Sequence, residues 1–458
     1  MRLSIISFGL GLLLTPSVQA QLFFDNNLPD AAPLIVPTTP SQVKIERTQP
    51  ITLEEALAIA NRGNRDIIQA QIAVNRNRAV LKEAEAARLP TVTASGSYTF
   101  NDSAQARLSN IAGGFGFDSS TISQPVTGTI GLNYNIFNSG LVETNIKAAE
   151  NQLRIAELAL NRVTQTVKIT VVTAYYNLQN TDENVRIQDK SVQNSQRSLR
   201  DTQALERAGV GTKFDVLQSQ VQLANAQQSL LDAKANQLIA RRELARQIEY
   251  PSNLDLSAAD KIEPTTPWKL PLEDTIILAL RNRSELDTEK LQREVARDRA
   301  RASIAQLGPQ VNLFANVDTA DNFSQVGGFA LGYRIGANVS ISLFDGGVAS
   351  AQVDQFKADQ ALAESRFQQA ANQVRFEVEQ AFINSKSRRE QIDTATLAVE
   401  QSTEALRLAR LRLSAGVGTQ LEVIRAEDDL IRADVNRLQA IIGFNQSISD
   451  LQRAINGF

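Results

Sequence analysis

The fold follows from one stretch, Ala208-Gly209-Val210-Gly211-Thr212, which returns letter for letter as Ala415-Gly416-Val417-Gly418-Thr419, 207 residues later. A second pair of matches, Ile136-Phe137-Asn138-Ser139-Gly140 and Leu343-Phe344-Asp345-Gly346-Gly347, has the same spacing. Self-similarity at a fixed spacing indicates an internal duplication. Neither copy has gained or lost a residue between its two motifs, so the duplicated segment has a length to maintain.

Long helical sequence separates the two motifs of each copy. Residues 141–208 and 348–415 contain no proline, and apolar residues recur in them at spacings of seven, as in a coiled-coil seam: Leu178, Val185, Val192 and Leu199, then Ile392, Val399 and Leu406. At 1.5 Å per residue each helix would be roughly 100 Å long. Because glycine ends helices in a left-handed conformation, each Ala-Gly-Val-Gly-Thr is predicted to turn a long helix into a return helix, at 213–249 and 420–455.

Strand patterns precede both long helices. After Pro90 and again after Pro309 the apolar period changes from about 3.6 to two residues, which predicts β-hairpins at 90–137 and 309–344. One face of each hairpin is apolar and the other polar, as in an outer-membrane β-barrel or in a soluble half-buried sheet. Four strands cannot close a barrel, so the barrel interpretation requires an oligomer. Three chains would supply twelve strands and leave an aqueous lumen.

The predicted fold class is mainly α with transmembrane β. A long α-helical coiled-coil barrel is continuous with a β-barrel of four strands per chain, twelve in a trimer, and both arise from the duplication. Each repeat is predicted to begin with a helix, which Thr52 and Glu55 mark in the first repeat as a capping box. In chain order we expect a cleaved signal peptide at 1–20, a Pro-rich leader at 21–50, a first repeat at 51–250, a linker at 251–271 and a second repeat at 272–456.

Composition limits the available chemistry. The 458 residues include no Cys and no His, so disulfides, thiolate or imidazole catalysis and zinc sites with the usual ligands are excluded. A formal net charge of −3, from 47 basic and 50 acidic residues, gives no electrostatic footprint for nucleic acid. Many catalytic designs are thereby removed, although carboxylate pairs remain. Together with the passive channel described below, this leads us to expect no enzyme activity, no cofactor, no metal and no nucleic-acid partner.

The duplicated order of elements carries a family resemblance. Helix, strand hairpin, Phe-Asn-Ser-Gly or Phe-Asp-Gly-Gly turn, long helix, Ala-Gly-Val-Gly-Thr turn and return helix together resemble the TolC family of outer-membrane efflux proteins, over nearly all of the chain from Thr52 onward. The resemblance implies a homotrimer with its barrel in outer-membrane lipid and a tunnel across the periplasm. It also implies two partners, an inner-membrane transporter and a periplasmic adaptor, for efflux of small molecules or type I secretion of proteins.

The resemblance assigns roles to the turns. The family's Val-Gly-Thr turns form the tunnel tip where the adaptor docks, and here the matching residues are Gly209, Val210, Gly211, Thr212, Gly416, Val417, Gly418 and Thr419. The alternative is that these residues serve the turn alone. At the other end of each long helix, Phe137 and Phe344 are expected to end strands. Asn138 and Asp345 are suitable N-caps before Gly140 and Gly347.

Acidic residues beside the tip form a candidate gate. The family narrows its tunnel with carboxylates after this turn, and Asp215 and Glu422 occupy matching positions 207 residues apart. Arg425 stands where the best-known member has a second acid. An ion pair between Glu422 and Arg425, three residues apart on one helix, is the equally plausible alternative.

Three functions fit an exported chain of this pattern. A passive export channel is the leading interpretation. A periplasmic adaptor-like coiled-coil protein is the alternative, although duplicated amphipathic hairpins argue against it. A secreted enzyme of mixed α and β structure would have to work with carboxylate pairs, and no acidic pair stands out in a loop.

Overall fold

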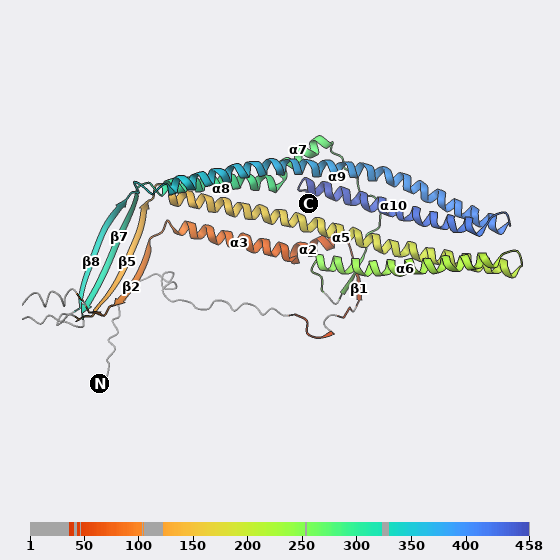
Figure 1. Ribbon diagram of the computed structural model, residues 1–458, viewed down its shortest axis with the longest axis horizontal. Helices are drawn as coiled ribbons and strands as arrows, with labels where there is room; N and C mark the ends of the chain where they lie inside the picture. Colours follow the sequence, from red (N-terminus) through yellow and green to blue (C-terminus); the bar gives the residue numbers. More distant parts are fainter. Residues whose placement is uncertain are drawn as a thin grey trace, which may run out of the picture.

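The computed structural model describes residues 36–40, 44–45, 47–102, 104, 122–251, 254–322 and 329–457. The predicted signal peptide and most of the leader lie outside these residues. The chain forms a long helical body with a small sheet at one end and two helical turns at the other (Figure 1). Within the described residues, no helix has both the length and the apolar composition to cross a membrane.

The helical body consists of four rods that lie side by side, where a rod is one long helix or two shorter helices placed end to end. Two are the long helices α5 (Leu141–Arg207) and α9 (Val348–Ser414), each of 67 residues. The other two are composite: α3 (Arg65–Ala86) and α6 (Lys213–Gln247) pack along α5, and α8 (Ser284–Ala305) and α10 (Gln420–Ala454) pack along both α5 and α9. The order across the layer is therefore α3/α6, α5, α8/α10, α9, which leaves α3/α6 and α9 at its edges (Figure 1).

The sheet has the order β2-β5-β7-β8, antiparallel throughout. Its strands are β2 (Thr91–Tyr98), β5 (Pro125–Phe137), β7 (Gln310–Asn322) and β8 (Ala330–Ser340), and β3 (Asn101–Asp102) pairs separately with β4 (Ile122–Ser123). The register aligns Val92 with Leu132, Leu132 with Ala315 and Ala315 with Ile335. One face is thus apolar across all four strands, and Val92 and Ile335 on it are exposed to solvent.

A parallel pair of strands clamps the middle of the body. β1 (Arg47–Ile51) pairs with β6 (Leu254–Ala258), although we expected an unstructured leader and linker there. Ile51 and Leu256 are buried against Tyr175 of α5. The clamp was not visible in the sequence because each strand is only five residues long and its partner is about 200 residues away.

Hydrogen bonds fasten the clamp to α5. The buried Tyr175 hydroxyl donates to Asp260 Oδ2 at 2.6 Å and lies 3.1 Å from the Ile51 carbonyl oxygen. Asp260 Oδ2 also accepts from the Leu53 amide at 2.8 Å, at the start of α2 (Leu53–Gly63). Burial, first, and the neighbouring Asp260 carboxylate raise the pKa of Tyr175 well above its usual value, so the hydroxyl remains a donor.

The first helix of each repeat is broken, where a single helix was expected. Asn64 and Arg283 have extended backbone at matching positions and separate α2 from α3 and α7 (Leu272–Asn282) from α8. The Asn64 side chain donates to the Gln247 carbonyl at 2.9 Å and accepts from the Asp66 amide. Each break therefore lies where the return helix of its own repeat ends.

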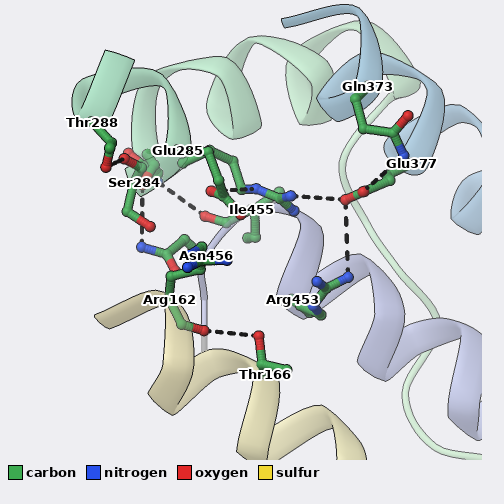
Figure 2. Close-up of polar contacts among 12 residues, drawn as sticks. Arg162, Thr166, Ser284, Glu285, Thr288, Gln373, Glu377, Arg453, Ile455 and Asn456 are labelled. Carbon is green, nitrogen blue, oxygen red and sulfur yellow. Dashed lines mark hydrogen bonds and ion pairs between the residues drawn. The ribbon is translucent and has the colours of Figure 1, made fainter. Parts of the chain in front are cut away.

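Charged side chains fill the second break. Arg283 is buried, and its guanidinium pairs with Glu285 at 3.1 Å and with Glu377 of α9 at 2.8 Å. Figure 2 shows Glu377 between this cluster and Arg453 of α10, which lies 3.9 Å away. Because a buried guanidinium must be paired, these contacts fix α7, α8, α9 and the end of α10 together.

Replacing Tyr175 with Phe tests the clamp. The variant loses a buried donor and leaves Asp260 with one partner fewer, so we expect the free energy of unfolding to fall by about 1–3 kcal/mol. Urea denaturation followed by circular dichroism measures the change. Tyr250→Phe is the matched control, because the Tyr250 hydroxyl donates to an exposed acceptor on β1, Gln49 Oε1. Equal stability of the two variants would contradict the anchoring role of Tyr175.

Candidate functional site

The two hairpin tips share one backbone geometry. α5 and α9 are each followed by a glycine in the left-handed region, Gly209 with φ 75° and Gly416 with φ 73°, as the sequence predicted. The Val210 and Gly211 amides donate to the Leu205 carbonyl at 3.1 and 3.0 Å. In the second tip the Val417 and Gly418 amides both donate to the Arg412 carbonyl at 3.0 Å. Figure 1 shows both tips at the same end of the molecule.

The second glycine of each tip is required for space. Gly211 and Gly418 do not have positive φ. A Cβ on Gly211 would lie 2.9 Å from the Leu205 Cβ and 3.0 Å from the Glu206 amide nitrogen, and one on Gly418 would lie 2.9 Å from the Arg412 Cβ. Only glycine lets the chain pass this close to the helix that it has just left.

The two tips differ in how their acidic residues are used. Thr212 caps α6, and Asp215 Oδ2 accepts from the Thr212 hydroxyl at 2.6 Å and from its amide at 3.2 Å. Thr419 caps α10 by accepting from the Glu422 amide at 3.3 Å, but the Glu422 carboxylate pairs with Arg412 Nε at 3.6 Å. Within the described residues no ion pair joins Glu422 to Arg425, so the alternative offered by the sequence does not form, and Glu422 pairs with Arg412 instead. The turn places Arg412 of α9 opposite the first turn of α10.

Exposed apolar residues surround the turns. Val210 and Val417 are 75% and 69% exposed, and Phe214 in the first turn of α6 is 70% exposed. Val216, two residues further along α6, is buried at 2%. The tips therefore present apolar side chains to solvent.

Polar contacts join the two hairpins near the tips. Arg410 of α9 donates to Glu427 of α10 at 2.8 Å and to Asn194 of α5 at 3.1 Å, and Gln420 donates to Ser198 at 2.9 Å. Burial raises the pKa of the Glu427 carboxyl, while Arg410 opposes the shift. Glu427 is buried because α5 and α9 cover that side of α10.

The N-caps of the long helices lie two residues later than expected. The N-cap residues are Gly140 and Gly347, both left-handed, rather than Asn138 and Asp345. Asn138 Oδ1 still accepts from the Val142 amide at 3.2 Å, and Asp345 Oδ2 accepts from the Ala349 amide at 2.7 Å. These side chains therefore satisfy the free amides of the first helical turn across the glycine.

The two phenylalanines before these turns are not equivalent. Phe137 is the last residue of β5, as predicted. Phe344 lies four residues beyond β8, which ends at Ser340, so the expectation that it ends a strand was wrong. It is 87% exposed. β8 is an edge strand of the four-stranded sheet and has no neighbour in the chain to extend its pairing past β7.

An antiparallel sheet continuous with two long helical hairpins that end in glycine turns defines the class of an outer-membrane export channel. A family model described as outer membrane efflux protein matches residues 56–248 and 275–457. The chain belongs to this family, whose members are outer-membrane channels of the TolC type and not enzymes. It functions in efflux or secretion at the outer membrane, and the adaptor-like alternative is not favoured.

Individual relatives agree with this assignment. The outer membrane efflux protein BepC of Brucella suis is 24% identical over 328 residues, which cover 69% of each chain. The outer membrane protein TolC of Escherichia coli is 25% identical over 236 residues, 51% of this chain and 46% of TolC. Among solved structures, the outer membrane channel CmeC of Campylobacter jejuni has a TM-score of 0.78 at 18% identity, covering 89% of this chain and 86% of CmeC.

Acid titration tests the capping role of Asp345. Hydrogen bonds from the amides of Ala349, first, and Gly347 lower the pKa of this carboxyl below its usual 3.8. A lowered folded-state pKa contributes stability that is present above the unfolded-state pKa and is lost as the pH falls through the folded-state pKa. Asp345→Asn introduces the residue that the first repeat has at the matching position, Asn138, and removes the titrating carboxyl. The melting temperature of the variant should therefore fall less steeply below about pH 4 than that of wild type. Parallel curves for the two proteins in circular dichroism would contradict this role.

Proposed function

We propose that three copies of this chain form the outer-membrane channel of a tripartite export system. It would conduct small molecules or proteins passively from an inner-membrane transporter and a periplasmic adaptor to the exterior. The observation that carries the proposal is the continuity of a sheet with an exposed apolar face and a body of 67-residue helices, in a chain of the efflux family.

The open edges of the sheet support the oligomer. β2 and β8 each pair on one side only, which leaves backbone donors and acceptors free. Such groups are not tolerated in hydrocarbon, so an apolar-faced sheet inserted in lipid has to close. β2 of one copy would pair with β8 of the next, and three four-stranded sheets make a twelve-stranded barrel with a lumen.

The edge rods support the same assembly. Both edge helices expose apolar residues at the spacings of a heptad repeat. On α6 these residues are Leu217, Val221, Leu231 and Leu238, and on α9 they are Phe376, Ile383, Leu397 and Leu411, which are spaced by multiples of seven. Helices with such seams pair with one another. Because α6 and α9 lie on opposite edges of the layer, α6 of one copy would meet α9 of the next and close a helical tunnel.

The tips are the proposed docking site of the adaptor. Their equal distance from the sheet would bring six turns to one plane in the trimer, each exposing Val210 or Val417. Asp215, Glu422 and Arg425 are the candidate lining of the tunnel mouth. For the two carboxylates to act as free charges there, their contacts with Thr212 and Arg412 have to open.

Recording in planar bilayers tests the channel. The purified oligomer should give steps of ionic conductance and should fractionate with outer membranes, because a water-filled lumen conducts ions without a transporter. Heat-denatured protein is the control. Recovery of the protein in the soluble periplasm, or oligomer without conductance, would contradict the proposal.

Substitution of the inner glycines tests the tips. Gly211→Leu with Gly418→Leu should abolish crosslinking to the copurifying periplasmic adaptor while the trimer stays intact, because each new Cβ displaces the turn from the helix beside it. Gly63→Leu is the control, since a Cβ there meets no atom within 4 Å. Unchanged crosslinking of the double variant would rule out docking at these turns.

A further inference from the structure

The polar face of the four-stranded sheet carries one isolated pair of opposite charges. Asp318 of β7 and Arg334 of β8 are the only charged residues on this face among the described strand residues 91–98, 125–137, 310–322 and 330–340. They are diagonal neighbours, because Asp318 is opposite Gly332 and Arg334 is opposite Asn316. The other residues of these strand segments that lie on this face are neutral, so this pair supplies the charge of the described part of the face.

Hydrogen bonds hold the carboxylate in place. Arg334 Nε donates to Asp318 Oδ2 at 3.2 Å, and the Thr129 hydroxyl of β5 donates to Asp318 Oδ1 at 3.0 Å. The Asp318 side chain is 33% exposed, whereas that of Arg334 is 70% exposed. The carboxylate is thus held between side chains of β5 and β8, and the guanidinium is the more exposed member of the pair.

Glycines allow the neighbouring side chains to lie close to the sheet backbone. A Cβ on Gly131 would lie 2.8 Å from Asn316 Oδ1, and one on Gly336 would lie 2.8 Å from Phe314 Cζ. The amide and the aromatic ring therefore lie flat across glycine backbone on the adjacent strands. Their flat arrangement leaves Arg334 as the prominent group on the polar face.

We propose that Asp318 and Arg334 form a charge-selecting band on the inner wall of the channel's outer-membrane end. This inference rests on the proposed trimer, which turns the polar face toward the lumen and repeats the pair three times. Arg334 attracts anionic groups of passing solutes, such as carboxylate, phosphate or sulfate, for which a guanidinium is the best-matched side chain. Asp318 positions the guanidinium and partly offsets its charge.

Ion selectivity measures the band directly. Reversal potentials in a KCl gradient give the chloride-to-potassium permeability ratio of the reconstituted channel. Arg334→Gln should lower this ratio about twofold and Asp318→Asn should raise it about twofold, because a narrow lumen with low-dielectric walls concentrates the field of each unpaired charge. Arg334→Lys should keep the wild-type ratio. Asn338→Gln, a neutral change on the same face of β8, is the control and should also keep it.

Salt dependence separates an electrostatic role from a structural one. The shifts should be present at 0.1 M salt, where the screening length is about 10 Å, and disappear at 1 M, where it is about 3 Å. If all variants conduct with the same chloride-to-potassium permeability ratio at 0.1 M salt, the charge-selecting role of Asp318 and Arg334 is contradicted, and the proposal that the protein is a channel still holds. Absence of conductance from wild type as well would overturn the proposed function instead. Migration of each variant as a heat-modifiable oligomer confirms that it has folded.

Discussion

Equal length is the constraint on which the rest of the structure depends. α5 and α9 have 67 residues each, and α6 and α10 have 35 each. At 1.5 Å per residue, one extra turn in either long helix would displace its tip by about 5 Å relative to the other. Both repeats start at the same sheet, so both tips end in the same plane only while these lengths match.

Rods of this length require cross-bracing, because neighbouring helices in a single layer touch along narrow seams. The β1–β6 clamp supplies it in the first repeat, through Tyr175 and Asp260. In the second repeat the cluster around Arg283 and Glu377 supplies it, at the break between α7 and α8. The clamp holds the start of α2 against α5, and the Arg283 cluster holds the break between α7 and α8 against α9.

The sheet and the helical body place different demands on their surfaces. On the sheet, the apolar face runs across all four strands, and among the described strand residues the polar face carries only Asp318 and Arg334 as charges. On the body, exposed apolar residues follow the two edge rods and the tips. A single chain therefore leaves apolar groups uncovered in three places, which the proposed assembly would cover with lipid, a second copy and a partner at the tip.

The sequence by itself determined the duplication, the long helices, the hairpins, the glycine turns and the family. Heptad spacing, two-residue alternation and helix-ending glycine depend only on residues that are close together in the chain, so they can be recognised without the tertiary structure. Tertiary structure alone decided the clamp strands, the breaks at Asn64 and Arg283, the burial of Glu427 and the pairing of Glu422 with Arg412 instead of Arg425. It also ended β8 before Phe344 and moved the caps of the long helices to the glycines. These features depend on which distant segment lies opposite a residue, and for a carboxylate or a short strand that neighbour is fixed only when the chain has packed.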